Sequence, residues 1–145
     1  MSTRTDQLLE MLGVNTRNLE ISAEVKKAFI NGTFYHFSLE RLDKAIASYQ
    51  EVTATEAKFA PAWLFMGICY CQLGEYEEAI AAYEKATQIH PTSQIAVEAW
   101  NGQGFAFEQL KQPQKAAAAY EHALAIDPKN AAARSNQERL QLVAG

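Results

Sequence analysis

A repeat at fixed spacing is the feature that most constrains what this chain can fold into. Seven positions of one segment recur 37 positions later, six with the same residue and one with Phe in place of Tyr; the two sets are Trp63, Gly67, Tyr70, Ala79, Tyr83, Ala86, Pro91 and Trp100, Gly104, Phe107, Ala116, Tyr120, Ala123, Pro128. Such a period indicates one supersecondary unit stacked on copies of itself, because a single unit cannot bury its own apolar face. The sequence therefore predicts a repeat stack.

A weaker copy precedes these two. Ala45, Ile46 and Tyr49 lie 34 positions before matching residues of the next copy. The same offset aligns three further residues with Trp63, Gly67 and Tyr70; they are Phe29, Thr33 and His36. We therefore expect a degenerate first copy in register with the others, in which His36 packs rather than catalyses.

Helical periodicity runs through each copy. Between Glu75 and His90, apolar residues stand three or four positions apart and form one stripe along a helix. Gly74 is placed to end the first helix of its pair in a left-handed conformation, and prolines follow the second helices. Lys111 replaces that glycine in the last pair, so we expect a differently built turn there, with Pro113 opening the next helix.

Eight helices follow from this pattern. We place them at Thr5–Leu12, Ser22–Phe37, Arg41–Thr55, Ala60–Leu73, Tyr76–Ile89, Gln94–Leu110, Pro113–Ile126 and Asn130–Leu142. Three extra residues between the last two copies fall within Thr92–Ala96, and we expect them to lengthen the start of the third pair by about one turn. The last helix is polar and suits a solvated cap.

These spaced residues resemble the tetratricopeptide repeat, a 34-residue helix-turn-helix unit with the pattern W-x2-L-G-x2-Y, A-x3-F and P. Met66 and Gln103 take the leucine place of that pattern. The resemblance covers residues 26–130 and implies an all-α, right-handed superhelical stack of three helix pairs, the first degenerate, with a short N-terminal helix and a C-terminal capping helix. One domain would then comprise residues 1–21, 26–59, 60–93, 97–130 and 131–145.

The resemblance also implies a concave groove, lined by the first helix of each pair, that binds a protein partner. Its inner positions carry the predicted binding residues: Ile30, Phe34, Phe37, Leu64, Phe65, Ile68, Cys71, Asn101, Phe105 and Glu108. We expect an exposed apolar surface with a polar exit near Asn101, Glu108 and Gln109. The alternative is that some of these side chains, such as Phe34 and Phe37 or Leu64 and Phe65, belong to the core.

One peptide-binding variant of the family grips a C-terminal carboxylate with Lys, Asn and Arg side chains. The corresponding positions in this chain hold none of these residue types; they are Ile30, Phe34, Phe65, Glu98 and Gly102. The sequence therefore predicts against recognition of chaperone C-terminal tails. It favours an apolar peptide or an amphipathic helix as the occupant of the groove, as for a scaffold, adaptor or co-chaperone-like module.

A short apolar stripe near the N-terminus is a second candidate occupant. It consists of Leu8, Leu9, Met11 and Leu12. This stripe would pack on the outer face of the first pair, fold back into its own groove, or enter the groove of a second copy. The last arrangement gives the alternative function, a structural module that forms homodimers through its N-terminal helix.

Composition excludes several other functions. The net charge of −4 argues against a nucleic-acid binder, and no apolar run is long enough for a membrane span. The sequence contains no phosphate-binding glycine loop, Cys-x-x-Cys pair or His-Glu-x-x-His motif, so we expect neither enzyme activity nor a cofactor or metal. Cys69 and Cys71 would point apart on a helix, which predicts free thiols and a cytoplasmic protein.

Overall fold

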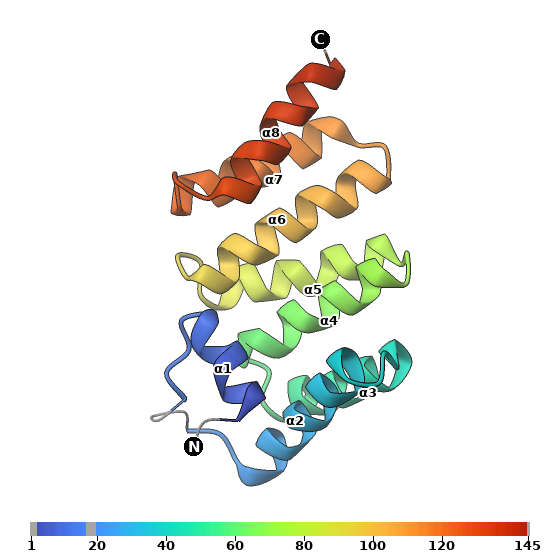
Figure 1. The fold of residues 1–145 in the computed structure, drawn as a ribbon, viewed down its shortest axis with the longest axis vertical. Coiled ribbons are helices and arrows are strands. Elements are labelled where there is room, and N and C mark those ends of the chain that lie inside the picture. Colours follow the sequence, from blue (N-terminus) through green and yellow to red (C-terminus); the bar gives the residue numbers. More distant parts are fainter. Residues whose placement is uncertain (1–2, 17–19, 145) are drawn as a thin grey trace.

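Eight α-helices make up the part of the chain that the structure describes, residues 3–16 and 20–144 of a computed structural model. In chain order they are α1 (Arg4–Met11), α2 (Ala23–Phe37), α3 (Leu42–Thr55), α4 (Ala60–Gln72), α5 (Tyr76–Ile89), α6 (Gln94–Gln109), α7 (Pro113–Ile126) and α8 (Ala131–Ala144). The helices α2 to α7 form three successive antiparallel pairs, stacked in sequence order (Figure 1). The predicted all-α stack of three pairs with a helix at each end is confirmed.

Side-chain caps explain where several helices begin. The hydroxyl of Thr3 accepts a hydrogen bond from the Asp6 amide, and the Asp6 carboxylate accepts one from the Thr3 amide, which closes a capping box on α1. Ser22 caps α2 and Ser93 caps α6 in the same way through their hydroxyls. With 16 residues, α6 is three residues longer than α4, as the spacing of the copies predicted.

The turns within the second and third pairs have the same geometry. Gly74 has φ of +76° and Lys111 has φ of +62°, so both residues adopt the left-handed conformation. The amide of the next residue bonds a carbonyl five residues back in each pair, from Glu75 to Tyr70 and from Gln112 to Phe107. The expectation of a differently built turn at Lys111 is therefore wrong, because this turn tolerates lysine in the strained conformation.

Tyrosine rings pack directly on glycines of the neighbouring helix. A Cβ atom added to Gly67 would lie 2.6 Å from the ring of Tyr83, and one added to Gly104 would lie 2.4 Å from the ring of Tyr120. Glycine is required at both positions because the aromatic ring occupies the space that any side chain would need. The alanines of the repeat pattern lie fully buried beside these contacts; they are Ala79, Ala86, Ala116 and Ala123.

In the first pair a tyrosine ring also packs on a glycine, but this glycine lies one residue earlier in α2 than the alignment of the copies predicts. The ring of Tyr49 packs on Gly32, 2.5 Å from where its Cβ would be, and not on Thr33. In the turn, the Arg41 amide bonds the carbonyl of Tyr35, six residues back instead of five, so this turn holds one extra residue. The alignment that placed Thr33 opposite Gly67 is therefore corrected to Gly32.

The same shift changes the partners of the flanking aromatics. Tyr35, not His36, takes the place of Tyr70 and Phe107, and Ala28, not Phe29, takes the place of the tryptophans. A lysine lies over the aromatic ring in both outer pairs: the Lys44 Nζ is 5.6 Å from the Tyr35 ring centre, and the Lys115 Nζ is 5.8 Å from that of Phe107. These matched contacts support the corrected alignment.

Candidate functional site: the concave face

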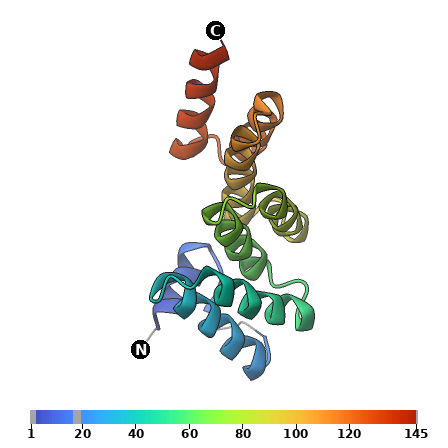
Figure 2. The ribbon, with the colours of Figure 1, turned by 90° about the vertical axis from the view of Figure 1, so that its right-hand side faces the viewer.

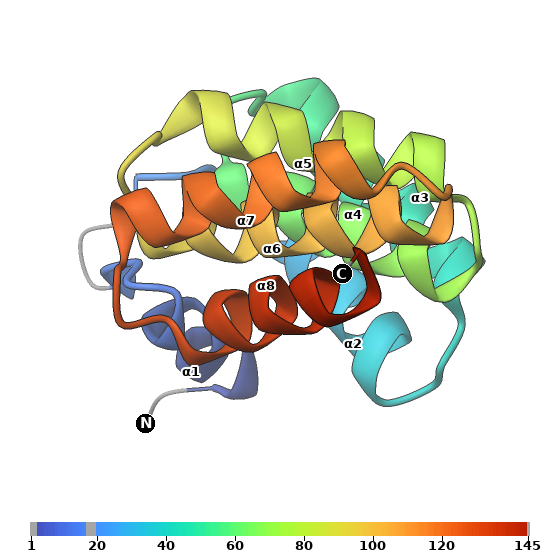
Figure 3. The same ribbon diagram turned by 90° about the horizontal axis from the view of Figure 1, so that it is seen from above.

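The first helices of the pairs form the inner wall of the stack. Seen along its long axis, α3, α5 and α7 lie along one side, whereas α1 and α8 lie on the other side with α4 and α6 between the two groups (Figure 3). From the side, α1 and α8 stand at opposite ends of this inner wall (Figure 2). The residues predicted to bind a partner come from α2, α4 and α6.

Several of the predicted binding residues reach solvent. Four apolar side chains are exposed by more than a third: Ile30 (36%), Phe34 (53%), Phe37 (37%) and Phe105 (44%). Ile68 and Cys71 are half-buried. The exposed phenyl ring of Phe105 contacts Tyr76 edge-on, with the ring centres 6.2 Å apart. The concave face therefore offers apolar surface on α2 and α6, with partly accessible residues of α4 between them.

Leu64 and Phe65, expected in the groove, are core residues instead. Leu64 is only 1% exposed and packs in a cluster with Ile95, against which Leu12 and Val14 of the N-terminal segment also lie. Phe65 is 5% exposed because its ring faces that of Phe29 at 5.8 Å and that of Tyr49 at 6.1 Å. These two side chains stabilise the stack and leave no accessible surface for a partner.

The N-terminal helix covers part of its own concave face. The hydroxyls of Thr5 and Thr33 lie 3.0 Å apart in a buried hydrogen bond, and Leu9 is 3% exposed within the core. Leu8 lines a pocket of about 220 Å³ together with Ile30, Phe34 and Phe37. Of the three placements considered for this stripe, the structure has the segment against its own inner helices and not on the outer face.

The polar end of the concave face is occupied by α8. Arg139 Nη2 donates a hydrogen bond of 2.6 Å to Oε1 of Glu108, and Tyr120 donates its hydroxyl proton to the same carboxylate. The Arg139 hydrogen bond is the main reason that the pKa of Glu108 lies below its ordinary value, and burial opposes it. Asn101 likewise donates to Asn130 Oδ1 at 3.0 Å. Neither Glu108 nor Asn101 is therefore a free polar exit.

His36 is buried at this face, as its predicted packing role requires, and it also makes a hydrogen bond. Nε2 of His36 lies 2.9 Å from Oε1 of Gln72, which links the first pair to the second. Burial lowers the pKa of His36, and the hydrogen bond to Gln72 partly opposes that effect. The imidazole is thus a polar link between repeats, which periodicity alone does not reveal because it reports only which helix face a residue occupies.

Both cysteines have free thiols, and both side chains are at least partly buried. Burial raises the pKa of the Cys69 thiol to about 12 and also raises that of Cys71, so neither is an activated nucleophile. Within residues 3–16 and 20–144, no three His, Cys, Asp or Glu side chains gather in a way that could hold a metal ion. None of the helices in the described part of the chain is long and apolar enough to cross a membrane.

Comparison with known proteins agrees with this geometry. Residues 58–129 match the model of the tetratricopeptide repeat. One curated relative, the human DnaJ homolog subfamily C member 7, is 29% identical over 85 residues, which is 59% of this chain and 17% of the relative. The chain thus spans about a sixth of the length of that protein.

Solved structures share the fold at low sequence identity. MamA superimposes with a TM-score of 0.78 at 18% identity, covering 100% of this chain and 86% of MamA. The first such domain of Spaghetti (RPAP3), solved with an HSP90 peptide, gives a TM-score of 0.77 at 20% identity, covering 86% of this chain and 97% of that one. At this level of sequence identity, the structural similarity shows a shared helical fold.

Proposed function

Since this chain belongs to the tetratricopeptide-repeat family, we propose that it is a non-catalytic protein-interaction module whose concave face binds an apolar peptide or an amphipathic helix. The observation that carries the proposal is the exposed apolar side chain of Phe105, beside the partly accessible Ile68 and Cys71. An inner wall of this composition gains binding free energy by removing apolar area from water. The free thiols Cys69 and Cys71 suit a reducing compartment such as the cytoplasm.

The occupant we propose is apolar rather than a charged C-terminal tail. The Spaghetti domain was solved with an HSP90 peptide. In this chain, Glu98 and Gly102 stand at inner positions where the carboxylate-gripping variant of the family carries cations. An acidic side chain repels a carboxylate at short range, so a terminal carboxylate is a poor ligand here. The N-terminal segment indicates the favoured chemistry, because Leu12 and Val14 of that segment already pack against the cluster that contains Leu64.

Substitution of Phe105 tests this proposal. We expect Phe105→Glu to leave the helical circular-dichroism spectrum unchanged and to abolish co-purification of the partner from native extract, with crosslinks of the parent protein mapping to α4 and α6. Leu142→Glu is the matched control, since Leu142 is 84% exposed on α8. Equal loss of the partner with both variants, or crosslinks confined to the outer helices, would refute a concave binding site.

A second candidate function is self-association through the N-terminal helix. The observation that favours it is the short length of α1, which has eight residues and leaves Met11 78% exposed, although Leu9 is buried and Leu8 and Leu12 are partly buried against the core. A segment held in this way can exchange with its equivalent in a second copy. Light scattering on the full chain and on a version without residues 1–20 distinguishes the two functions. A dimer that is lost on truncation supports self-association, and a monomer in both cases contradicts it.

A further inference from the structure

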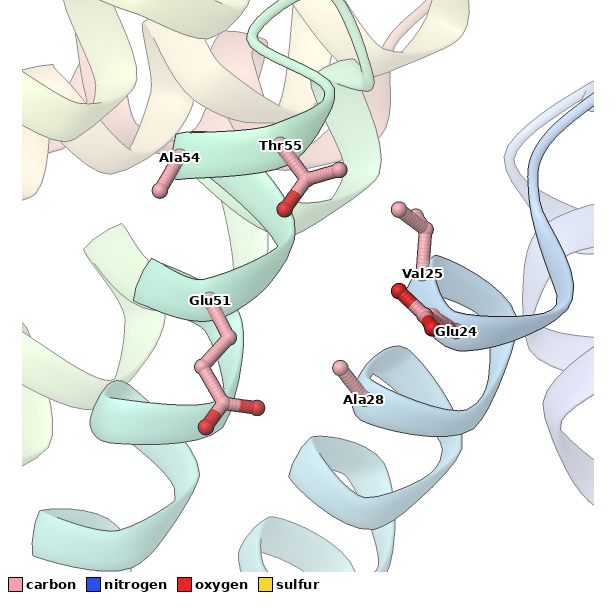
Figure 4. Close-up of a pocket in the computed structure, with 6 residues that line it drawn as sticks. All are labelled: Glu24, Val25, Ala28, Glu51, Ala54 and Thr55. Atoms are coloured by element: carbon pink, nitrogen blue, oxygen red, sulfur yellow. The ribbon is translucent and has the colours of Figure 1, made fainter.

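A pocket of about 310 Å³ opens between α2 and α3 (Figure 4). It lies where the N-terminal part of α2 passes the C-terminal part of α3, and the side chains around it are Glu24, Val25, Ala28, Glu51, Ala54 and Thr55. In Figure 4 the helix α1 lies on the opposite side of α2 from this opening. The pocket is therefore separate from the concave face.

The internal repeats show what fills this place elsewhere in the molecule. In the corrected alignment, Ala28 occupies the position of Trp63 and Trp100. The indole of Trp100 stacks on the imidazole of His122, with ring centres 4.2 Å apart and planes inclined by 15°. It also packs on a buried cluster that contains Val97, with Ile126 alongside.

The equivalent wall positions of the first pair carry partly different side chains. Val25 stands at the position of Val97, Thr55 at that of Ile126 and Glu51 at that of His122. Val25 keeps the aliphatic wall, Thr55 and Glu51 replace Ile126 and His122 with more polar side chains, and the methyl group of Ala28 stands where an indole would fill this slot. Because protein interiors and interfaces gain stability from close packing, an open slot of this shape favours an aromatic ring from outside the chain.

The rim of the slot selects among aromatic rings. The carboxylates of Glu24 and Glu51 lie on either side of the opening in Figure 4, and neither has a hydrogen-bond or ion-pair partner among the described residues. Carboxylates are acceptors, and the indole N–H is a donor that a phenyl ring lacks. An indole of this chain already acts as such a donor, since Nε1 of Trp63 donates a hydrogen bond to the backbone carbonyl of Ala57 at 2.9 Å.

We propose that this slot binds a tryptophan side chain of a protein partner. The ring of the partner lies against Ala28 and Ala54, and its N–H donates to the carboxylate of Glu24 or Glu51. The site is independent of the concave face, so one module would hold its partner at two places, which raises the overall affinity by the effective-concentration effect.

Titration with N-acetyl-tryptophanamide, followed by amide nuclear magnetic resonance on the intact chain, tests the proposal. We expect saturable shifts at Val25, Ala28 and Ala54, with half-saturation at about 1 mM for a ligand of this size. The phenylalanine analogue should bind roughly threefold to tenfold more weakly, since it leaves the carboxylates without the N–H. Tighter binding of N-acetyl-argininamide than of the tryptophan probe, or no saturable shift, would overturn the proposal.

Two sets of variants locate the binding. Ala28→Trp fills the slot from within and should abolish the shifts, whereas Ala47→Trp, at an exposed position of α3, should leave them unchanged. Glu24→Ala combined with Glu51→Ala should remove the preference for tryptophan over phenylalanine without changing the helical content. The double glutamate variant tests the proposal even if Ala28→Trp disturbs folding. If that variant still prefers the tryptophan probe over the phenylalanine analogue, the proposed hydrogen bond is contradicted.

Discussion

The hydroxyl of Tyr49 lies 3.3 Å from Nδ1 of His36, and the corresponding tyrosine makes the corresponding contact in each of the other two pairs. Tyr83 points its hydroxyl to Sγ of Cys71 at 3.7 Å, and Tyr120 donates to the carboxylate of Glu108. The same structural position on the inner helix is occupied by a different side chain in each pair, and each of these side chains contacts the tyrosine of the outer helix. The chemistry at this position therefore differs from pair to pair: an imidazole, a thiol and a carboxylate.

Protonation of His36 should destabilise the first pair. Burial lowers its pKa in the folded chain, whereas the unfolded chain binds the proton at the ordinary value of 6.5. Its contribution to stability is therefore complete above about pH 6.5 and declines as the pH falls below that value toward the folded pKa. Urea unfolding at about pH 5.5 and about pH 7.5 should show a lower free energy of unfolding at the acidic pH. His36→Gln should flatten that difference; an equal slope in both proteins would contradict it.

Gly67→Ala should destabilise the second pair even though alanine favours helices. The helix propensity gained is about 1 kcal/mol. The new Cβ would lie 2.6 Å from the Tyr83 ring, and overpacking of this kind costs about 1–3 kcal/mol beyond that gain. Adding Tyr83→Leu should restore part of the lost stability, as a double-mutant cycle of thermal melts would show. A Gly67→Ala protein as stable as the parent would mean that the ring moves aside without cost.

Phe65→Glu and Phe105→Glu should have opposite consequences for folding. Phe65 is buried among four rings, those of Phe29, His36, Phe37 and Tyr49, so a carboxylate there should cost at least about 4 kcal/mol and unfold much of the chain. Phe105 is 44% exposed, and we expect the melting temperature of Phe105→Glu to stay within a few degrees of the parent value. Circular-dichroism melts separate the two outcomes, and a folded Phe65→Glu protein would show that its position is part of an open groove.

Loss of Arg139 should loosen the capping helix. The guanidinium bonds Glu108, whose side chain is 13% exposed, and the exposed half of Arg139 limits the stabilisation to about 1 kcal/mol. Arg139→Ala should raise hydrogen exchange in α8, and Arg134→Ala, on the exposed surface of the same helix, should not. Since the pKa of Glu108 is lowered, this stabilisation is complete above the ordinary carboxyl pKa of about 4.5 and is lost as the pH falls below it. Equal exchange in both variants would contradict the prediction.

The repeat can be recognised from the spacing of residues along the sequence. Trp63, Gly67 and Tyr83 recur with fixed offsets, and helical periodicity together with glycine and proline placed the ends of α4 to α7 within a residue or two. These signals are local, because helix periodicity and helix termination depend on residues near one another in the chain. The extra turn at the start of α6 could be predicted for the same reason.

The binding surface could be predicted only in part. Phe34, Phe37 and Phe105 are exposed as a groove requires, whereas Leu64 and Phe65 are buried. Residue spacing along each copy predicts which side chains face inward, but it does not show where α1 lies or how neighbouring copies interdigitate. The sequence likewise predicts a free polar exit at Glu108 and Asn101, because their partners Arg139 and Asn130 lie 31 and 29 residues further along the chain.

The sequence by itself determined that this chain is a stack of helix pairs, since the repeat period, the apolar helical stripes and the small residues that pack opposite tyrosines can all be identified in it. Only the tertiary structure decided the position of the first inner helix. Thr33 matches Gly67 by number, but the Tyr49 ring needs a position without a Cβ and finds it at Gly32, and the turn before Arg41 absorbs the one-residue difference. Packing of a large ring on a bare backbone is a contact between helices, so it decides between two alignments that local sequence leaves equally plausible.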